Sequence, residues 1–223
     1  MSTIIALIIN YNRLTLPAKM ADWLAGHGHR VVILDNNSDY PPLLEYYDNT
    51  PHEVLKLGFN YGSAAPWHPK PAVLDRYEVQ GDFIVTDPDL DVSGIPGDWL
   101  SVLKEGLAKY DFACKSGFSL RIDDLPNSEI GNMARKVESG HWKDPLADGR
   151  FYRAYIDTTF CLCRTRLHDF PAVRAAPPYC ARHVPWYYTS VLDIPDDELY
   201  YMRSTKSRGS TYWTSRIGES LGI

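Results

Sequence analysis

The feature that most constrains the fold is an alternation of apolar strands and helices in the first half of the chain. The run from Ile4 to Ile9 is continuous, apolar and rich in β-branched residues, which is typical of a strand buried in a parallel sheet. Further strands are predicted over 30–34, 54–57 and 82–86. Strands that alternate with helices form a largely parallel sheet with helices on its faces. The sequence therefore predicts an α/β fold.

Helices are predicted after the first and fourth strands. Apolar residues recur at helical spacing over 16–24, where Thr15 can cap the helix, and again over 99–107, where Asp98 can do so. After Tyr110 the pattern changes, and the remaining elements are predicted less regularly along the chain. They are strands over 112–115, 118–122 and 155–163, a polar helix near 128–138, an irregular loop over 171–185 and a short helix over 196–202.

Charge and hydropathy exclude two classes of partner. The net charge of −5 and the absence of a Lys/Arg-rich run argue against nucleic acid. The longest apolar run near the start is far too short to cross a bilayer, so no integral membrane segment is expected. Four cysteines without paired Cys-x-x-Cys motifs favour buried free thiols and a cytoplasmic location.

Polar residues follow each strand of the first half. They are Asn10 to Arg13, Asp35 to Ser38, Gly58 to Gly62, and Asp87 to Asp91. Ligands of open α/β sheets bind outside the carboxyl ends of the strands, so these four loops are expected to converge on one cleft.

The loop after the fourth strand carries three carboxylates, Asp87, Asp89 and Asp91, at alternating positions. Such a group repels itself unless a cation neutralises it. Mn²⁺ or Mg²⁺ fits, because these ions accept one or two carboxylates together with diphosphate oxygens. The alternative is a solvated acidic turn without a ligand.

At these residues the chain resembles a known family. The segment Phe83 to Asp89 looks like the strand-plus-DxD signature of GT-A glycosyltransferases, and Ile8 to Arg13 and Leu34 to Ser38 are similar to donor-site segments of family 2. Ile156 to Phe160 and Arg182 to Tyr187 resemble a less studied branch in bacteria and large viruses. The resemblance implies a Rossmann-like, mostly parallel sheet flanked by helices, with a mixed β portion on the acceptor side. It also implies a single domain over 1–223, in which 1–110 binds the nucleotide and 111–223 the acceptor.

The resemblance also implies roles at the donor end of the cleft. Asn10, Tyr11 and Arg13 would line the nucleoside pocket, and Asp35 would accept the imide hydrogen of the base. Asp35 can equally be a turn residue. Two further residues, Asn60 and Gly62, would contact ribose or diphosphate, although turn residues need no ligand.

Four residues form the expected metal site. By resemblance, Asp87 would touch the ribose or sugar as well as the metal, Asp89 would bind the metal, and Asp91 would bind it directly or through another group. A late histidine, His183, would complete the set, since neutral imidazole is a competent ligand. The alternative for His183 is a packed loop histidine.

Asp157 is the expected reactive carboxylate near the acceptor hydroxyl or the anomeric carbon. An inverting enzyme would use it as a general base, and a retaining enzyme as a nucleophile or electrostatic partner. The chain lacks the late Glu-Asp pair and the Gln/Arg-rich Trp motif of inverting family 2 enzymes, so the stereochemistry stays open. His183 and Asp91 complete the candidate catalytic set.

Aromatic and basic residues elsewhere are weaker candidates. Flat faces for sugar stacking are expected among Trp67, His68, Trp142, Trp186 and Tyr187, and core packing is the alternative for each. The basic residues of the tail, Lys206, Arg208 and Arg216, can belong to a segment that closes over the diphosphate or to a solvated tail.

Taken together, these residues favour a metal-dependent glycosyltransferase with a nucleoside-diphosphate sugar as donor, UDP being the expected carrier. A glycan, a lipid-linked intermediate or a protein would be the acceptor. A haloacid-dehalogenase-like phosphatase is one alternative, because those enzymes also place Asp-x-Asp after a buried strand. A non-catalytic carbohydrate-binding module is the other.

Overall fold

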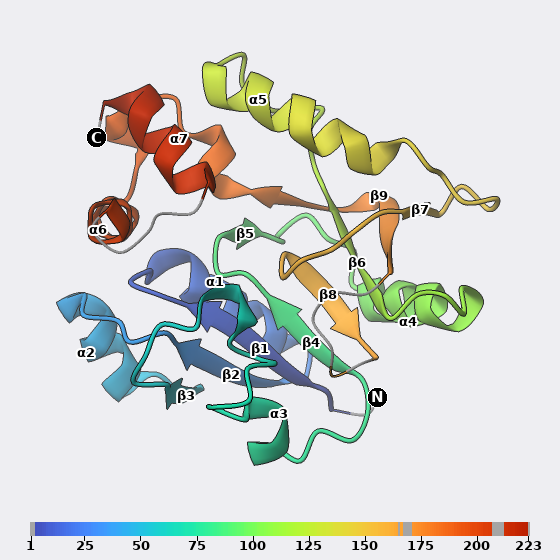
Figure 1. Ribbon diagram of the computed structural model, residues 1–223, viewed down its shortest axis with the longest axis horizontal. Helices are drawn as coiled ribbons and strands as arrows, with labels where there is room; N and C mark the ends of the chain where they lie inside the picture. Colours follow the sequence, from blue (N-terminus) through green and yellow to red (C-terminus); the bar gives the residue numbers. More distant parts are fainter. Residues whose placement is uncertain (1–2, 165, 167–170, 207–211, 223) are drawn as a thin grey trace.

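The structure is a computed structural model that describes residues 3–164, 166, 171–206 and 212–222. Its central feature is a mixed, curled sheet flanked by helices, so the predicted α/β class is confirmed. Within the described residues the sheet has nine strands, ordered β3-β2-β1-β4-β8-β6-β9-β5, and β7 pairs with β9 (Figure 1).

The first half of the chain forms the parallel part of this sheet. The strands β1 (Ile5–Asn10), β2 (Arg30–Asp35), β3 (Glu53–Lys56) and β4 (Phe83–Thr86) all run in one direction. They are joined by α1 (Thr15–Gly26), α2 (Pro41–Asn49), and the short α3 (Val73–Arg76) with a helical turn at Gly62–Ala64. Because the strands are parallel, their carboxyl ends all meet at one edge.

The second half continues the same sheet with mixed strands. β8 (Phe160–Cys163) is antiparallel to β4, and β6 (Lys115–Leu120) is antiparallel to β8. β9 (Ala172–His183) runs parallel to β6, whereas β7 (Phe151–Arg153) and β5 (Leu90–Asp91) pair with β9 antiparallel. The acceptor-side mixed portion expected from the sequence is therefore an extension of the parallel sheet.

Among the described residues, four more helices follow β5 along the chain. α4 is Trp99–Lys109, α5 is Glu129–Glu138, α6 is Asp196–Lys206 and α7 is Tyr212–Leu221. Single helical turns occur at Ser139–Trp142, Val184–Tyr187 and Val191–Asp193. Figure 1 shows α5, α6 and α7 on the opposite side of the molecule from β1 to β3.

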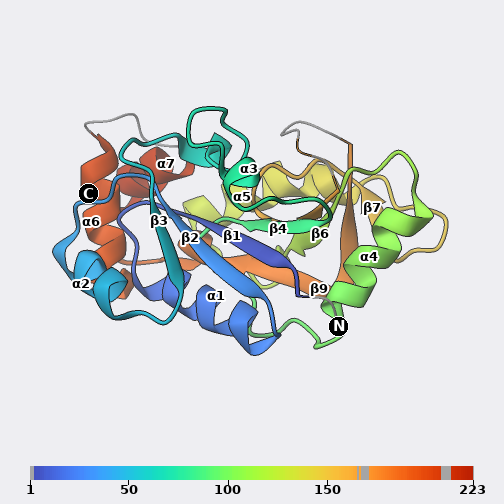
Figure 2. The same cartoon turned by 90° about the horizontal axis from the view of Figure 1, so that it is seen from below.

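Side chains alternate between two cores, one on each face of the sheet. Ala6 and Ile8 of β1 face the larger core with α1 and α4, whereas Leu7 and Ile9 face the smaller one with α3. Figure 2 shows α1 and α3 on opposite sides of the parallel strands. Full burial of β1 explains why its sequence is continuously apolar.

Four local predictions are wrong. The segment 171–185 was expected to be an irregular loop because of its prolines, but most of it is the long strand β9, which shifts register opposite Phe118 and Ser119. Proline is tolerated at such irregularities. Residues 155–159 were expected to be a strand and are irregular, since β8 begins only at Phe160. Thr15 lies inside α1 instead of capping it, and the carboxylate of Asp98 binds the Tyr179 hydroxyl.

Two observations concern the cysteines and the possibility of a membrane-spanning helix. All four cysteines are free, and Cys161 and Cys163 are buried with their sulfurs 3.4 Å apart. Among the residues that the structure describes, no helix combines the length and apolar character needed to span a bilayer.

Candidate active site

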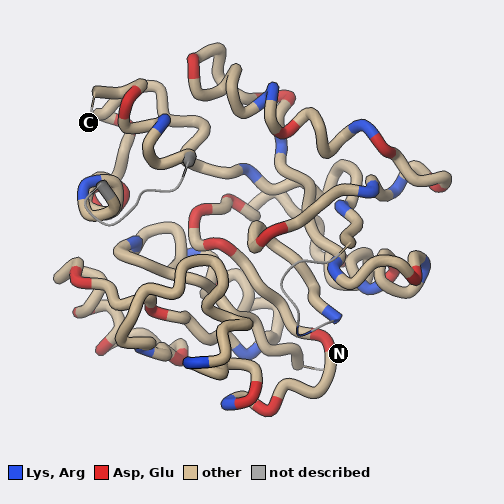
Figure 3. Tube along the Cα trace, in the orientation of Figure 1, with Lys and Arg blue, Asp and Glu red and all other residues tan. Residues whose placement is uncertain are grey.

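A cavity of about 510 Å³ opens at the carboxyl ends of the parallel strands. The four polar loops predicted to converge all reach it. The residues that line it from these loops are Asn10, Tyr11, Arg13, Asn36, Asn60, Gly62, Ser63 and Asp87 to Asp89. α5, α6 and α7 supply the facing wall, with residues such as Val137, Tyr201 and Trp213. Figure 3 shows acidic segments close together near β5, between these two parts.

Asp89 is the most constrained carboxylate in the cavity. It is 6% exposed, and its Oδ2 lies 3.3 Å from an Arg13 nitrogen and 3.4 Å from Nε2 of His183. Burial raises the pKa of Asp89, but the charges of His183 and Arg13 outweigh it and hold that pKa well below its ordinary value. Its Oδ1 is buried without a hydrogen-bond partner. One oxygen is thus available to a ligand.

The pKa of the neighbouring Asp87 is shifted in the opposite direction from that of Asp89. Burial, followed by the charges of Asp157 and Asp89, raises the pKa of Asp87 to about 8. A carboxylate crowded by two others is the situation in which a bound cation is stabilising.

The cation Arg13 is held from the other side by α6. Its guanidinium forms two hydrogen bonds to Glu198, of 2.6 and 2.7 Å, and stacks 3.6 Å from the ring centroid of Tyr201. Arg13 is 7% exposed, so it is a fixed, buried charge beside Asp89. A planar guanidinium in such a position suits a phosphate group.

His183 comes from the last residue of β9, which pairs with Leu90 of β5. Its ring lies 4.6 Å from that of Trp186, and its Nδ1 is buried without a partner. Burial lowers the pKa of His183, but Asp89 raises it further, and the net shift is upward. The strand pairing therefore places a histidine from late in the chain against the acidic loop.

The remaining predicted donor residues form the cavity wall. Asn10 donates to the Arg13 carbonyl and to the Tyr47 hydroxyl, and its Oδ1 is buried without a partner. Asn60 accepts from the amide of Gly62, whose φ of +59° is the left-handed conformation that glycine favours. Tyr11 packs edge-on against Tyr201 at 6.3 Å. Asn10, Tyr11, Asn60 and Gly62 all line the cavity, whereas Tyr47 does not.

Asp35 does not line the cavity. It is 3% exposed, and its carboxylate accepts hydrogen bonds from the Ser38 amide and the Tyr47 hydroxyl. Those bonds are the turn role that the sequence left open. Asn36 lines the cavity in its place, with its side chain bonded to the Tyr61 amide and the Gly62 carbonyl.

Asp91 also lies outside the cavity lining. It belongs to β5, opposite Arg182 of β9, and its carboxylate accepts from the Ser93 amide and lies 3.8 Å from the Arg182 guanidinium. The expected set of three carboxylates is therefore reduced to Asp87 and Asp89. Because β5 turns Asp91 toward another strand, we leave it out of the proposed ligand and catalytic sets.

Asp157 lines the cavity from the irregular segment before β8. Asp157 is exposed, and its Oδ1 accepts hydrogen bonds from the amide and the hydroxyl of Thr159, at 3.1 and 2.6 Å. Burial raises the pKa of Asp157, but these Thr159 hydrogen bonds outweigh it, so the pKa lies below its ordinary value. Asp157 is thus an ionised carboxylate facing the cavity.

Several polar residues of the cavity were not predicted from the sequence. Arg174 and Glu138 form a buried ion pair of 2.5 Å beside Asp157, and Glu198 binds Arg13. His141 lies nearby. Arg174 belongs to the Pro/Ala-rich segment for which the sequence predicts a loop, and its place in the sheet follows only from β9.

The aromatic candidates divide in two. Trp186 lines the cavity, whereas Trp67, His68, Trp142 and Tyr187 do not. The Tyr187 hydroxyl binds Asp124, and the Trp142 ring contacts that of Tyr152.

Little of the basic tail can be placed. Arg208 and the side chain of Lys206 lie outside the described residues. Arg216 is exposed and pairs with Glu219 within α7.

The donor atoms present fit a divalent metal that is only partly held by protein. Within the described part of the chain, no three His, Cys, Asp or Glu side chains form a ready-made metal cluster. Asp89 Oδ1 and His183 Nδ1 are nevertheless buried polar atoms without partners, and Asp87 is adjacent. Mg²⁺ and Mn²⁺ characteristically take one or two carboxylates and complete their shell with phosphate oxygens and water. The cavity therefore suits an ion that arrives with a diphosphate.

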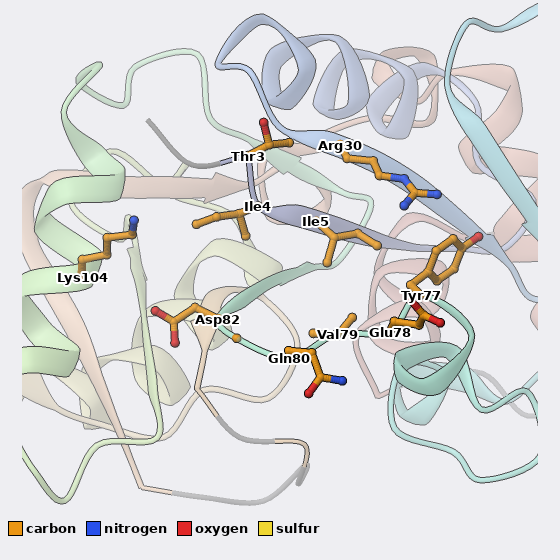
Figure 4. A pocket seen from close by; sticks show the side chains of 11 residues that line it. Thr3, Ile4, Ile5, Arg30, Tyr77, Glu78, Val79, Gln80, Asp82 and Lys104 are labelled. Carbon is orange, nitrogen blue, oxygen red and sulfur yellow. The ribbon is translucent and has the colours of Figure 1, made fainter.

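A second cavity, of about 430 Å³, lies at the opposite edge of the sheet (Figure 4). Its walls include Ile4 at the start of the chain, Asp82 before β4 and Lys104 of α4. The figure shows Asp82 and Lys104 on separate walls, so this acid and this base do not face one another across a common point. The carboxyl edge is the better candidate for chemistry.

Comparisons with known proteins give limited information. No protein-family model matches the chain, and no curated protein matches it. Four chains of solved structures match. One is TarS from S. aureus (residues 1–349), a glycosyltransferase, at 11% identity and a TM-score of 0.47, covering 99% of this chain and 69% of that one. A likeness this weak carries no argument about function, which must come from the site.

Proposed function

We propose that this protein is a metal-dependent glycosyltransferase that moves a sugar from a nucleoside-diphosphate donor, with UDP as the favoured carrier, to an acceptor hydroxyl. The observation that carries the proposal is the composition of one cavity at the carboxyl edge of the sheet. It contains Asp87, Asp89 and His183, a buried cation at Arg13, and a separate ionised carboxylate at Asp157.

The donor would bind across the loops after β1, β2 and β3. The amides of Asn10, Asn36 and Asn60 line this part of the cavity and offer the neutral hydrogen-bonding groups that a base and ribose require. Arg13 would contact the diphosphate, because a planar guanidinium suits phosphate oxygens and this one is fixed in the cavity wall between Asp89 and Glu198.

Asp87, Asp89 and His183 would hold a Mn²⁺ or Mg²⁺ ion together with the diphosphate. When bound, such an ion neutralises charge on the leaving nucleoside diphosphate as a Lewis acid. The chain contributes two carboxylates of different basicity, since the pKa of Asp89 is low and that of Asp87 is raised to about 8.

Asp157 would act at the sugar or the acceptor. Its carboxylate remains ionised and faces the cavity, so it can accept the proton of an acceptor hydroxyl, or attack or stabilise the anomeric carbon. The Arg174–Glu138 pair lies on the same side and would help to define the acceptor region.

The geometry weighs against the phosphatase alternative. For the pair Asp89 and Asp91, that chemistry would need both carboxylates at one phosphate, but Asp89 lines the cavity whereas Asp91, on β5, lies beside Arg182 of β9. The other alternative, a non-catalytic carbohydrate-binding module, needs neither a buried cation such as Arg13 nor an ionised carboxylate such as Asp157, and the cavity contains both.

Turnover of matched variants tests the proposal. We expect wild-type protein with Mn²⁺ to hydrolyse or transfer at least one of the UDP, GDP, dTDP or CMP sugars. Asp89→Asn should lower kcat/KM about 100-fold or more, in the range seen when a residue that stabilises developing charge is removed. Asp91→Asn should stay within a few-fold of wild type, because Asp91 does not line the cavity. Undiminished turnover by folded Asp89→Asn would remove the proposed mechanism.

A further inference from the structure

A lysine lies at the centre of the sheet without contact with solvent. Lys115 is 0% exposed, begins β6, and pairs with Cys163 of β8 on one side and Ala172 of β9 on the other. A buried ammonium group is costly unless hydrogen bonds and charges compensate it. Its partners therefore indicate what it does.

The ammonium group contacts backbone carbonyls and a ring. Its Nζ donates to the carbonyl of Ile156 at 3.1 Å and to that of Asp157 at 2.8 Å, and lies 5.0 Å from the ring centroid of Trp67. No ion pair between Lys115 and a carboxylate is found within residues 3–164, 166, 171–206 and 212–222. The Lys115 ammonium group therefore binds the segment that carries Asp157.

In the middle of that segment, over the described residues 155–158, no backbone hydrogen bond to another strand is found. Residues 154–159 lie between β7 and β8, and three consecutive carbonyls accept from buried cations: that of Tyr155 from Arg174 at 2.8 Å, and those of Ile156 and Asp157 from Lys115. Buried carbonyls need partners, and here side chains replace a strand ladder. The Ile156 and Asp157 carbonyls are therefore paired with the Lys115 ammonium group.

We propose that Lys115 is a positioning residue: it fixes the backbone of Ile156 and Asp157 so that the exposed Asp157 carboxylate faces the cavity. Thr159 fixes only one oxygen of this carboxylate, whereas Lys115 fixes the main chain beneath it. The kinetic part of this inference rests on the proposed glycosyl transfer, but the structural part does not.

Position matters because small displacements of a reacting group lower the rate strongly. The donor residues Asn10, Arg13 and Asp89 belong to other loops, whereas the Lys115 ammonium group contacts Ile156, Asp157 and Trp67. Loss of the ammonium group should therefore impair the step that Asp157 performs more than it impairs donor binding.

The experiment compares Lys115→Met, which removes the donor, with Lys115→Gln, which retains an N–H donor, and with the exposed control Lys104→Met. With Mn²⁺ and the donor that wild type uses, we expect Lys115→Met to lower kcat at least tenfold while KM for the donor changes less than threefold. Lys115→Gln should be intermediate, and Lys104→Met should match wild type. A purely structural role would instead change kcat and KM together, without rescue by glutamine.

Hydrogen exchange gives a readout that does not depend on turnover. The Thr159 amide donates to Asp157, so peptides covering 154–159 should exchange faster in Lys115→Met while β4 keeps its protection. If wild type turns over no nucleotide sugar, the proposed function fails, and exchange then decides the role of Lys115. Should Lys115→Met not fold, Lys115→Gln is compared with wild type by the same two measurements. Unchanged exchange over 154–159, or kcat within twofold of wild type in an active protein, would overturn the inference.

Discussion

At the scale of single residues, the direction of a side chain decides its role more than its place in a motif. Asp87, Asp89 and Asp91 alternate along the sequence, and their location after a buried strand predicted a site at the end of β4. The sequence did not show that Asp91 would enter β5 and lie opposite Arg182. That outcome depends on pairing with a strand almost one hundred residues away, which no local pattern reports.

Asp35 and Asp157 show the same limit. Asp35 was placed correctly at the end of β2, but its carboxylate turns inward to Ser38 and Tyr47. Asp157 reaches the cavity as expected, although the strand predicted around it is absent. The location of a polar residue relative to a strand end was predictable, and its orientation was not.

Gly117 tests how tightly the sheet is packed next to the Asp157 segment. A Cβ at this position would lie 2.1 Å from the Phe160 carbonyl oxygen and 2.8 Å from Cδ1 of Ile156. Because a backbone carbonyl cannot move aside cheaply, Gly117→Ala should lower the free energy of unfolding by about 1–3 kcal/mol or more. Urea denaturation measures this, with Gly94→Ala as the control, since nothing lies within 4 Å of its Cβ. Equal stability of the two variants would show that the close approach is not real.

At the scale of elements, side chains from distant segments can cap a helix whose own residues do not. The α1 helix has no side-chain cap from its own N-cap residue, Leu14. Asp197 of α6 caps it instead, accepting from the Leu14 and Thr15 amides at 2.7 Å each. Glu198 on the same turn holds Arg13, so α6 is fixed to the entrance of α1 by two adjacent carboxylates.

The Asp197 contact gives an element-scale prediction. Asp197→Ala should lower the free energy of unfolding by about 1 kcal/mol, the usual cost of removing a helix cap. The exposed neighbour Asp196 is the matched control. Asp196→Ala should change the free energy of unfolding by only a few tenths of a kcal/mol. Chemical denaturation of both variants checks the difference. If Asp197→Ala is as stable as Asp196→Ala, α6 does not anchor α1 in this way.

The elements that were mispredicted share a physical cause. The apolar alternation around Ile156 and Phe160 fits a strand, but buried cations bind the carbonyls that a strand would have paired. Conversely, the prolines at 177 and 178 suggested a loop, but they lie in β9 where its pairing with β6 shifts register. Both exceptions arise from tertiary contacts, which outweigh local propensity.

At the scale of the whole molecule, the sheet joins the two halves of the chain. β4 from the first half pairs with β8 from the second, and β8 with β6, so the expected nucleotide and acceptor halves share one continuous sheet. The α/β class and the convergence of loops were predictable, because parallel strands bring their carboxyl ends to one edge. The facing wall from α5, α6 and α7 was not, since their packing is fixed by contacts such as Glu198 to Arg13.

We propose that this wall and the loop edge together enclose a metal-bound nucleoside diphosphate. Calorimetric titration with UDP, with and without Mn²⁺, tests it on the intact protein. We expect wild type and Asp91→Asn to bind UDP at least tenfold more tightly with Mn²⁺, and Asp89→Asn to lose this difference. Equal UDP affinity with and without Mn²⁺ in wild type, or an unchanged Mn²⁺ effect in Asp89→Asn, would contradict the account.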